Sequence, residues 1–111
     1  MQESTVYRIV LCTCPNMGAA EGIANQLVAA GLAACVNIVP GLKSVYLWEG
    51  AVTADDELLL MIKTTAARYQ DLEDAIREVH PYELPEIVSV PILAGLPGYL
   101  QWIQDATSTS R

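Results

Sequence analysis

Leu58-Leu59-Leu60-Met61-Ile62 is the most informative part of the sequence for the fold. Side chains along a strand point alternately to the two faces of a sheet. Leu58, Leu60 and Ile62 therefore share one face of the predicted strand, while Leu59 and Met61 share the other. Both faces are apolar, so we expect one face to pack on helices of the same chain and the other on a second protein surface.

The residues before this stretch predict a long β-hairpin. The chain is strand-like over 34–48, with a break at Pro40-Gly41, and Glu49-Gly50 supplies a turn before the second strand. An arm of about 15 residues extends roughly 50 Å at about 3.3 Å per residue. A domain of about 100 residues has a radius of gyration of only about 13 Å. Unless Pro40-Gly41 folds it back, the hairpin must overhang its own core.

The remaining elements complete the order β-α-β-β-α-β-α. Strands are predicted over 6–14 and 87–92, and helices follow Asn16, follow Thr65 and begin at Pro97. This order predicts an α+β, ferredoxin-like split βαβ fold, with an antiparallel sheet and its helices on one face. The length of 111 residues fits a single domain over 1–111, with a disordered polar tail at about 107–111.

Composition limits the classes of partner. Hydrophobic residues make up 52% of the chain and charged residues 17%, which favours burial of surface against another copy of the chain. The net charge of −7 repels nucleic acids and anionic membranes, so neither is predicted as a partner. No apolar run approaches the roughly 20 residues that span a bilayer, and 1–5 lacks the basic start of a signal peptide. We therefore predict a cytoplasmic protein with reduced cysteines.

Two segments carry residues that could bind a metal. Cys12 and Cys14 lie two residues apart on a strand and so share a face, where thiolates could bind copper or zinc. The alternative is that both are small buried hydrophobes. His80 is the only histidine and begins His80-Pro81-Tyr82-Glu83-Leu84-Pro85-Glu86, a loop that two prolines stiffen. This loop is either a metal or ligand site or a rigid turn after a helix.

Other polar residues suggest a cleft. Glu57 and Lys63 flank Leu59 and Met61 on one face, so they are either solvated strand ends or the rim of a pocket shared with a neighbouring chain. Trp48, near the hairpin tip, is expected to contact a partner subunit. Asp55-Asp56-Glu57 lacks the turn glycine of a calcium loop and is interpreted as a solvated bend.

Several blocks of the chain, taken together, resemble the CutA divalent-cation-tolerance family in order and spacing. The likeness runs from about Val6 to Ile103. The blocks are Val10-Leu11-Cys12-Thr13, Ala33-Ala34-Cys35-Val36-Asn37-Ile38-Val39-Pro40-Gly41, Ser44-Val45-Tyr46-Leu47-Trp48-Glu49-Gly50, Ile62-Lys63-Thr64 and His80-Pro81-Tyr82-Glu83-Leu84-Pro85-Glu86-Ile87.

The resemblance implies a homotrimer similar in architecture to PII signalling proteins, with clefts between subunits. It also implies tolerance of copper and other divalent cations, with copper bound at Cys12 and His80. Some members carry a second histidine where this chain has Val79, which removes one potential ligand. No cofactor is predicted to be obligatory, and no enzyme is predicted, because nothing supplies an activated nucleophile with an oxyanion site.

Two functions therefore stay open. The first is a trimeric copper- or divalent-metal-binding protein. The second is a trimeric sensor or scaffold that takes a small ligand or a partner protein in a cleft. The residues expected to line that cleft are Trp48, Glu57, Lys63, Tyr82 and Glu83.

Overall fold

The structure is a computed structural model, and its described residues are 6–108. The predicted order β-α-β-β-α-β-α is confirmed, and one turn of 3-10 helix, η1, leads into the second α-helix. The elements are β1 (Tyr7–Cys14), α1 (Met17–Ala29), β2 (Cys35–Trp48), β3 (Ala51–Thr65), η1 (Ala66–Arg68), α2 (Tyr69–Val79), β4 (Ile87–Pro91) and α3 (Pro97–Ala106).

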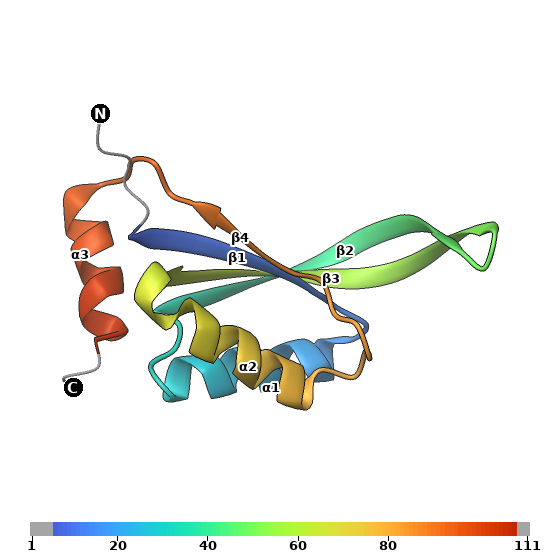
Figure 1. Cartoon of the computed structure of the whole chain (residues 1–111), viewed down its shortest axis with the longest axis horizontal. Helices are drawn as coiled ribbons and strands as arrows, with labels where there is room; N and C mark the ends of the chain where they lie inside the picture. Colours follow the sequence, from blue (N-terminus) through green and yellow to red (C-terminus); the bar gives the residue numbers. More distant parts are fainter. Residues whose placement is uncertain (1–5, 109–111) are drawn as a thin grey trace.

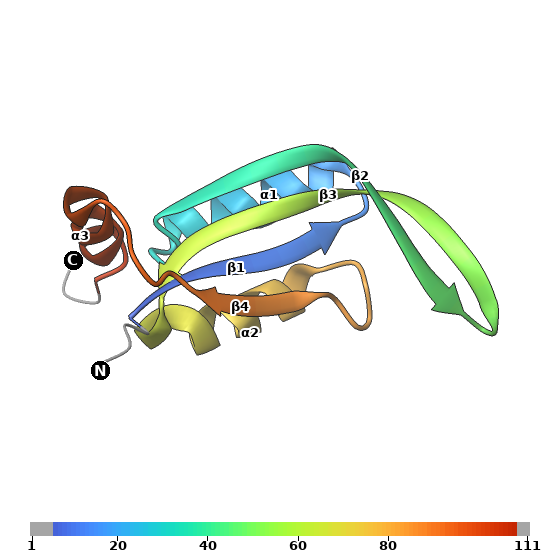
Figure 2. The same cartoon turned by 90° about the horizontal axis from the view of Figure 1, so that it is seen from above.

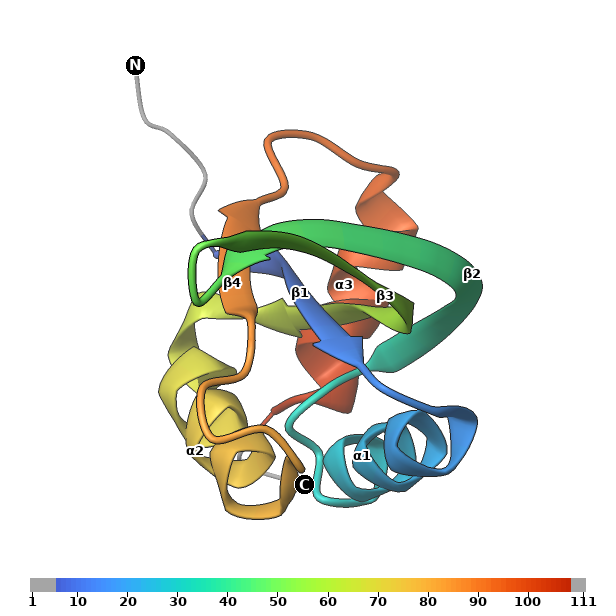
Figure 3. The same ribbon diagram turned by 90° about the vertical axis from the view of Figure 1, so that its right-hand side faces the viewer.

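The four strands form one antiparallel sheet in the order β2-β3-β1-β4. The first and third strands are central, as the split βαβ pattern requires. α1 and α2 lie side by side on one face of the sheet (Figures 1 and 3). The prediction that all helices share this face is wrong for α3, which stands across the end of the sheet (Figures 1 and 2). β4 ends at Pro91, and the chain then passes beyond the sheet before α3 begins. α3 therefore packs against the end of the sheet, where its Ile103 is fully buried.

The apolar run on β3 divides between the two faces as predicted. Leu60 and Ile62 are fully buried beneath the helices, in a core that includes Leu27 of α1 and Ile76 of α2. Met61 pairs with Leu11 of β1 on the opposite face and keeps part of its surface exposed. The helical face of the sheet is therefore closed within the chain, and the other face remains apolar and accessible.

The hairpin of β2 and β3 overhangs the core, as predicted (Figures 1 and 2). Its strands stay paired out to Trp48 and Ala51. Glu49 and Gly50 both have positive φ, at 50° and 82°, which is the two-residue turn that matches the twist of a hairpin. Pro40-Gly41 does not fold the arm back, because the two residues form a bulge between Val39 and Leu42 and the pairing then resumes.

Two smaller predictions are corrected. Asp55-Asp56-Glu57 is not a bend but part of β3, because its residues pair with β2 and Asp56 forms an ion pair of 2.6 Å with Lys43. The predicted tail at 107–111 begins too early. Thr107 is 2% exposed and its hydroxyl donates a 2.8 Å hydrogen bond to the carbonyl oxygen of Ile103. Residues 109–111 lie outside the described residues. Within 6–108, no helix is both long and apolar enough to cross a membrane.

Candidate metal centre and adjoining cleft

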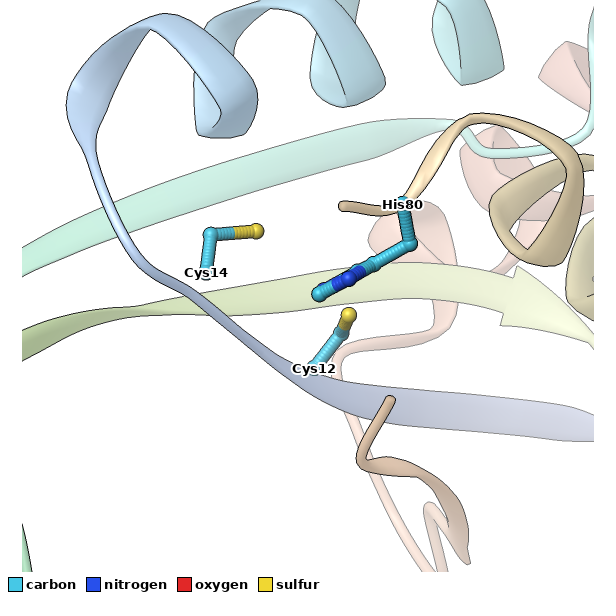
Figure 4. Close-up of side chains that lie close together, drawn as sticks. All are labelled: Cys12, Cys14 and His80. Atoms are coloured by element: carbon cyan, nitrogen blue, oxygen red, sulfur yellow. The ribbon is translucent and has the colours of Figure 1, made fainter. Parts of the chain in front are cut away.

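Cys12, Cys14 and His80 form a buried cluster, called here the Cys–His cluster. One potential ligand atom from each lies within 4.8 Å of the others. Figure 4 shows the imidazole reaching from the end of α2 towards the two thiols on β1. Both cysteines are fully buried and His80 is 8% exposed. The cluster therefore joins the predicted residues Cys12 and His80 and adds Cys14 to them.

The local structure explains why these three side chains meet. Cys12 pairs with Leu60 and Cys14 with Leu58, so both thiols point to the face that α1 and α2 cover. His80 caps the C-terminal end of α2, and its amide donates a 2.8 Å hydrogen bond to the carbonyl oxygen of Ile76. Pro81 disfavours helical backbone at His80, whose ψ of 136° turns the chain towards β1.

Both ring nitrogens of His80 already have partners in the protein. Nε2 lies 2.8 Å from the carbonyl oxygen of Thr13, and Nδ1 accepts a 3.1 Å hydrogen bond from the backbone N–H of Tyr82. A carbonyl oxygen can only accept and an N–H can only donate, so Nε2 carries the proton and Nδ1 is bare. The geometry thus defines a neutral imidazole with a fixed tautomer. These two hydrogen bonds fix the orientation of the imidazole at the start of the loop.

The two thiols of the cluster differ in acidity. Interaction with Cys14 raises the pKa of Cys12, and burial and the nearby carboxylates of Glu86 and Glu57 raise it further. Interaction with the Cys12 thiol lowers the pKa of Cys14, against the effect of burial. The pair therefore loses its first proton much more easily than its second.

A cleft of about 900 Å³ adjoins the cluster. It lies between the overhanging hairpin and the loop that follows α2, and Thr13, whose carbonyl contacts His80, lines it. The other lining residues are Tyr46, Trp48, Asp55, Glu57, Pro81, Tyr82, Glu83, Leu84 and Glu86. Four of the five residues predicted to form a cleft are thus brought together: Trp48, Glu57, Tyr82 and Glu83.

Two tyrosine–carboxylate pairs organise this cleft. The Tyr82 hydroxyl donates a 2.7 Å hydrogen bond to Oε2 of Glu57, which is only 9% exposed. Burial raises the pKa of Tyr82, and the Glu57 hydrogen bond raises it further. Tyr46 donates in the same way to Asp55, and this bond raises the pKa of Tyr46. Tyr82 also packs on His80, with the ring centroids 4.9 Å apart.

Lys63 is the predicted cleft residue that the single chain does not bring to the cleft. It lies six residues beyond Glu57 on β3, which is about 20 Å along a strand. There it pairs with Cys35 and Ile9 and hydrogen-bonds the side chain of Asn37. Alternation alone placed Glu57 and Lys63 on one face, but alternation does not make them neighbours.

The sequence interpretation left six lining residues out of the predicted cleft, and two of them, Tyr46 and Asp55, come from the hairpin. The signal for them was the same two-residue spacing that joined Cys12 to Cys14. Tyr46 lies two residues before Trp48, and Asp55 lies two residues before Glu57, so each shares a strand face with a predicted cleft residue. Because 55–57 was interpreted as a bend and not as a strand, the alternation that places Asp55 and Glu57 on one face was not applied to it.

Comparison with known proteins assigns the chain to a family. The sequence model of the protein family described as CutA1 divalent ion tolerance protein matches residues 8–106. The chain belongs to the CutA divalent ion tolerance family. A divalent-cation tolerance protein CutA from Thermus thermophilus is 48% identical over 99 residues, which are 89% of this chain and 96% of that protein. A CutA homologue from Xenopus laevis is 48% identical over 93 residues, covering 84% of this chain but 62% of the longer relative.

Solved structures agree with the family assignment. The divalent cation tolerance protein from Thermus thermophilus superposes with a TM-score of 0.90 at 47% identity, covering 92% of this chain and 99% of that one. A CutA structure from Archaeoglobus fulgidus, described as periplasmic, gives 0.89 at 35% identity and covers 92% and 99% of the two chains. These names describe tolerance of cations and not an enzymatic activity. The resemblance inferred from the sequence blocks is thus confirmed.

Proposed function

We propose that this CutA protein binds copper, in its cuprous form, through Cys12, Cys14 and His80, and that this binding underlies a role in metal tolerance. The observation that supports the proposal is the convergence of two thiols and an imidazole within 4.8 Å. Thiolate sulfur is a soft donor that selects cuprous copper, and imidazole also binds copper well. Zinc favours four ligands, whereas this group offers three.

The residues present fit such an ion after a small adjustment. Metal–sulfur bonds of about 2.3 Å place trigonal ligands about 4.0 Å apart. Donor atoms within 4.8 Å must therefore close by roughly 1 Å at most. The Cys14 thiolate, which forms first, would supply the negative charge. His80 would supply a nitrogen once it gives up the Tyr82 hydrogen bond, when Nδ1 binds, or both of its hydrogen bonds, when Nε2 binds. A bound ion would contribute charge neutralisation and cross-linking of β1 to the end of α2.

The test is an anaerobic titration of the reduced protein with cuprous copper held by the chelator bicinchoninate. We expect one ion per chain. Loss of a group that only supports a metal ligand typically weakens metal affinity by about 10- to 100-fold. Loss of a ligand itself should cost more, so we expect a larger decrease in Cys12→Ala, Cys14→Ala and His80→Ala. Cys35→Ala is the matched control, because Cys35 is the third thiol and lies outside the cluster. Equal affinity in all four variants would refute the site.

A second function, a small-ligand sensor, is favoured by the cleft itself. Its volume of about 900 Å³ suits a small molecule, and its described lining includes aromatic rings and four carboxylates but no lysine or arginine. Such a lining favours a ligand that carries an organic cation. Titration with spermidine, followed through the fluorescence of Trp48 in a Trp102→Phe background, should saturate, whereas the dianion succinate should not. No difference between the two probes would remove this candidate.

Assembly into a PII-like homotrimer is also part of the proposal. It is supported by the accessible apolar face of the sheet and by the overhanging hairpin, whose Leu47, Trp48 and Val52 are 69%, 61% and 77% exposed. A neighbouring chain would cover these surfaces and could bring its Lys63 to the cleft. Sedimentation equilibrium should give three times the mass of 12.0 kDa. A stable monomer would contradict the proposal. The cytoplasmic location, and the exclusion of nucleic acids and membranes, stay predictions from composition.

A further inference from the structure

We propose that His80 couples the Cys–His cluster to the cleft, so that metal in the cluster releases Tyr82 from Glu57 and changes what the cleft can bind. This inference rests on the proposed metal site and adds its regulation. The two sites share a continuous chain of contacts: His80 to Tyr82 through a 3.1 Å hydrogen bond and ring packing, and Tyr82 to Glu57 at 2.7 Å.

The coupling follows from the hydrogen-bonding capacity of a neutral imidazole. If a metal takes Nδ1, it replaces the backbone N–H of Tyr82 directly. If a metal takes Nε2 instead, the single ring proton must move to Nδ1, and an N–H then faces the N–H of Tyr82. Either mode removes the acceptor of the Tyr82 amide. The result does not depend on which nitrogen binds the metal.

The loss of this bond acts on the cleft because Tyr82 belongs to both sites. Its amide is held by the cluster, and its hydroxyl is held by Glu57 on the hairpin. Because Tyr82 is held at its backbone amide and at its hydroxyl, a shift of the amide strains the hydrogen bond of the hydroxyl. We infer that metal binding weakens the Tyr82–Glu57 bond and turns the Glu57 carboxylate towards the cleft. That change favours a cationic ligand there, and by reciprocity such a ligand favours metal binding.

The direction of the effect gives a distinctive prediction for Tyr82, which is a positioning residue and not a metal ligand. Its bond to Glu57 stabilises the metal-free arrangement, so removing the hydroxyl should make metal binding easier. In Tyr82→Phe, the affinity for cuprous copper should rise by about 2- to 10-fold, the equivalent of one ordinary hydrogen bond. Tyr82→Phe is preferred to a change of Glu57, because Glu57→Ala would also remove a carboxylate that raises the pKa of Cys12.

The experiment uses the full reduced chain and the cuprous bicinchoninate complex in three measurements. The first is the affinity of each variant. The second is the position of the Tyr82 amide signal in heteronuclear NMR, since cuprous copper is diamagnetic. The third is the fluorescence of Trp48 in a Trp102→Phe background. Tyr69→Phe is the matched control, because Tyr69 donates a 2.8 Å hydrogen bond to Glu73 that takes no part in either site.

The outcomes separate the coupling from the metal site itself. The proposal is supported if metal shifts the Tyr82 amide and the Trp48 emission, and if Tyr82→Phe alone of the two tyrosine variants binds more tightly. Metal binding that leaves the Tyr82 amide and Trp48 unchanged overturns the coupling but keeps the proposed function. Equal or weaker binding by Tyr82→Phe also overturns it. Absence of copper binding to the unmodified chain overturns both.

Discussion

Replacing His80 tests how much of the fold depends on the residue that the proposed site uses. In His80→Ala, two groups lose their partners: the carbonyl oxygen of Thr13, in a buried bond, and the amide of Tyr82, in a partly buried one. A buried group left unpaired costs about 1–3 kcal/mol, and an ordinary hydrogen bond contributes about 0.5–1.5 kcal/mol. We therefore expect the metal-free variant to lose about 1.5–4.5 kcal/mol of unfolding free energy.

The assay is urea denaturation of the metal-free protein, followed by circular dichroism at one fixed protein concentration, because assembly would otherwise change the apparent stability. Val79→Ala is the control. Val79 is the preceding residue and is 46% exposed, so its truncation should cost less than about 1 kcal/mol. A His80→Ala variant within about 0.5 kcal/mol of the unmodified chain would refute the doubly bonded, neutral His80. The loss of unfolding free energy also matters for the copper titration of His80→Ala. If the variant is strongly destabilised, its weaker copper affinity partly reflects unfolding and not only the missing ligand.

Three further predictions follow from single contacts. Thr64 is fully buried and its hydroxyl donates to Leu32 at 2.7 Å, so Thr64→Val should cost about 1–3 kcal/mol in urea denaturation, whereas Thr53→Val on the exposed hairpin should be near neutral. Of the three thiols, Cys35 alone should react quickly with a thiol reagent in the folded protein, and fast reaction of all three would contradict the buried cluster. Burial and the bond to Glu73 raise the pKa of Tyr69 from 10.0 to about 12, so its stabilisation is complete below pH 10 and declines as the pH rises towards 12. Tyr69→Phe should lose less stability than the unmodified chain over that interval, and an identical alkaline loss would contradict the shift.

The order of the elements was predictable because local patterns determine it. Two-residue alternation on β3 indicated a central strand, and the strand order confirms it. Glu49-Gly50 indicated the hairpin turn, and its backbone angles show why those residues suit it. The position of α3 was not predictable in this way. Its apolar spacing specifies a buried side, but not which part of the sheet covers that side.

The candidate site also has features that local sequence predicts and features that depend on the folded chain. Local spacing was enough to predict that Cys12 and Cys14 share a strand face and that two prolines restrict the path of the loop from His80, because both are properties of neighbouring residues. The folded chain was needed to show that His80 reaches those thiols across 66 residues of chain from Cys14, that Tyr82 hydrogen-bonds Glu57, and that Lys63 lies far from the cleft. The physical reason is that distances between distant segments depend on strand register and on helix packing against the sheet, which no local spacing encodes.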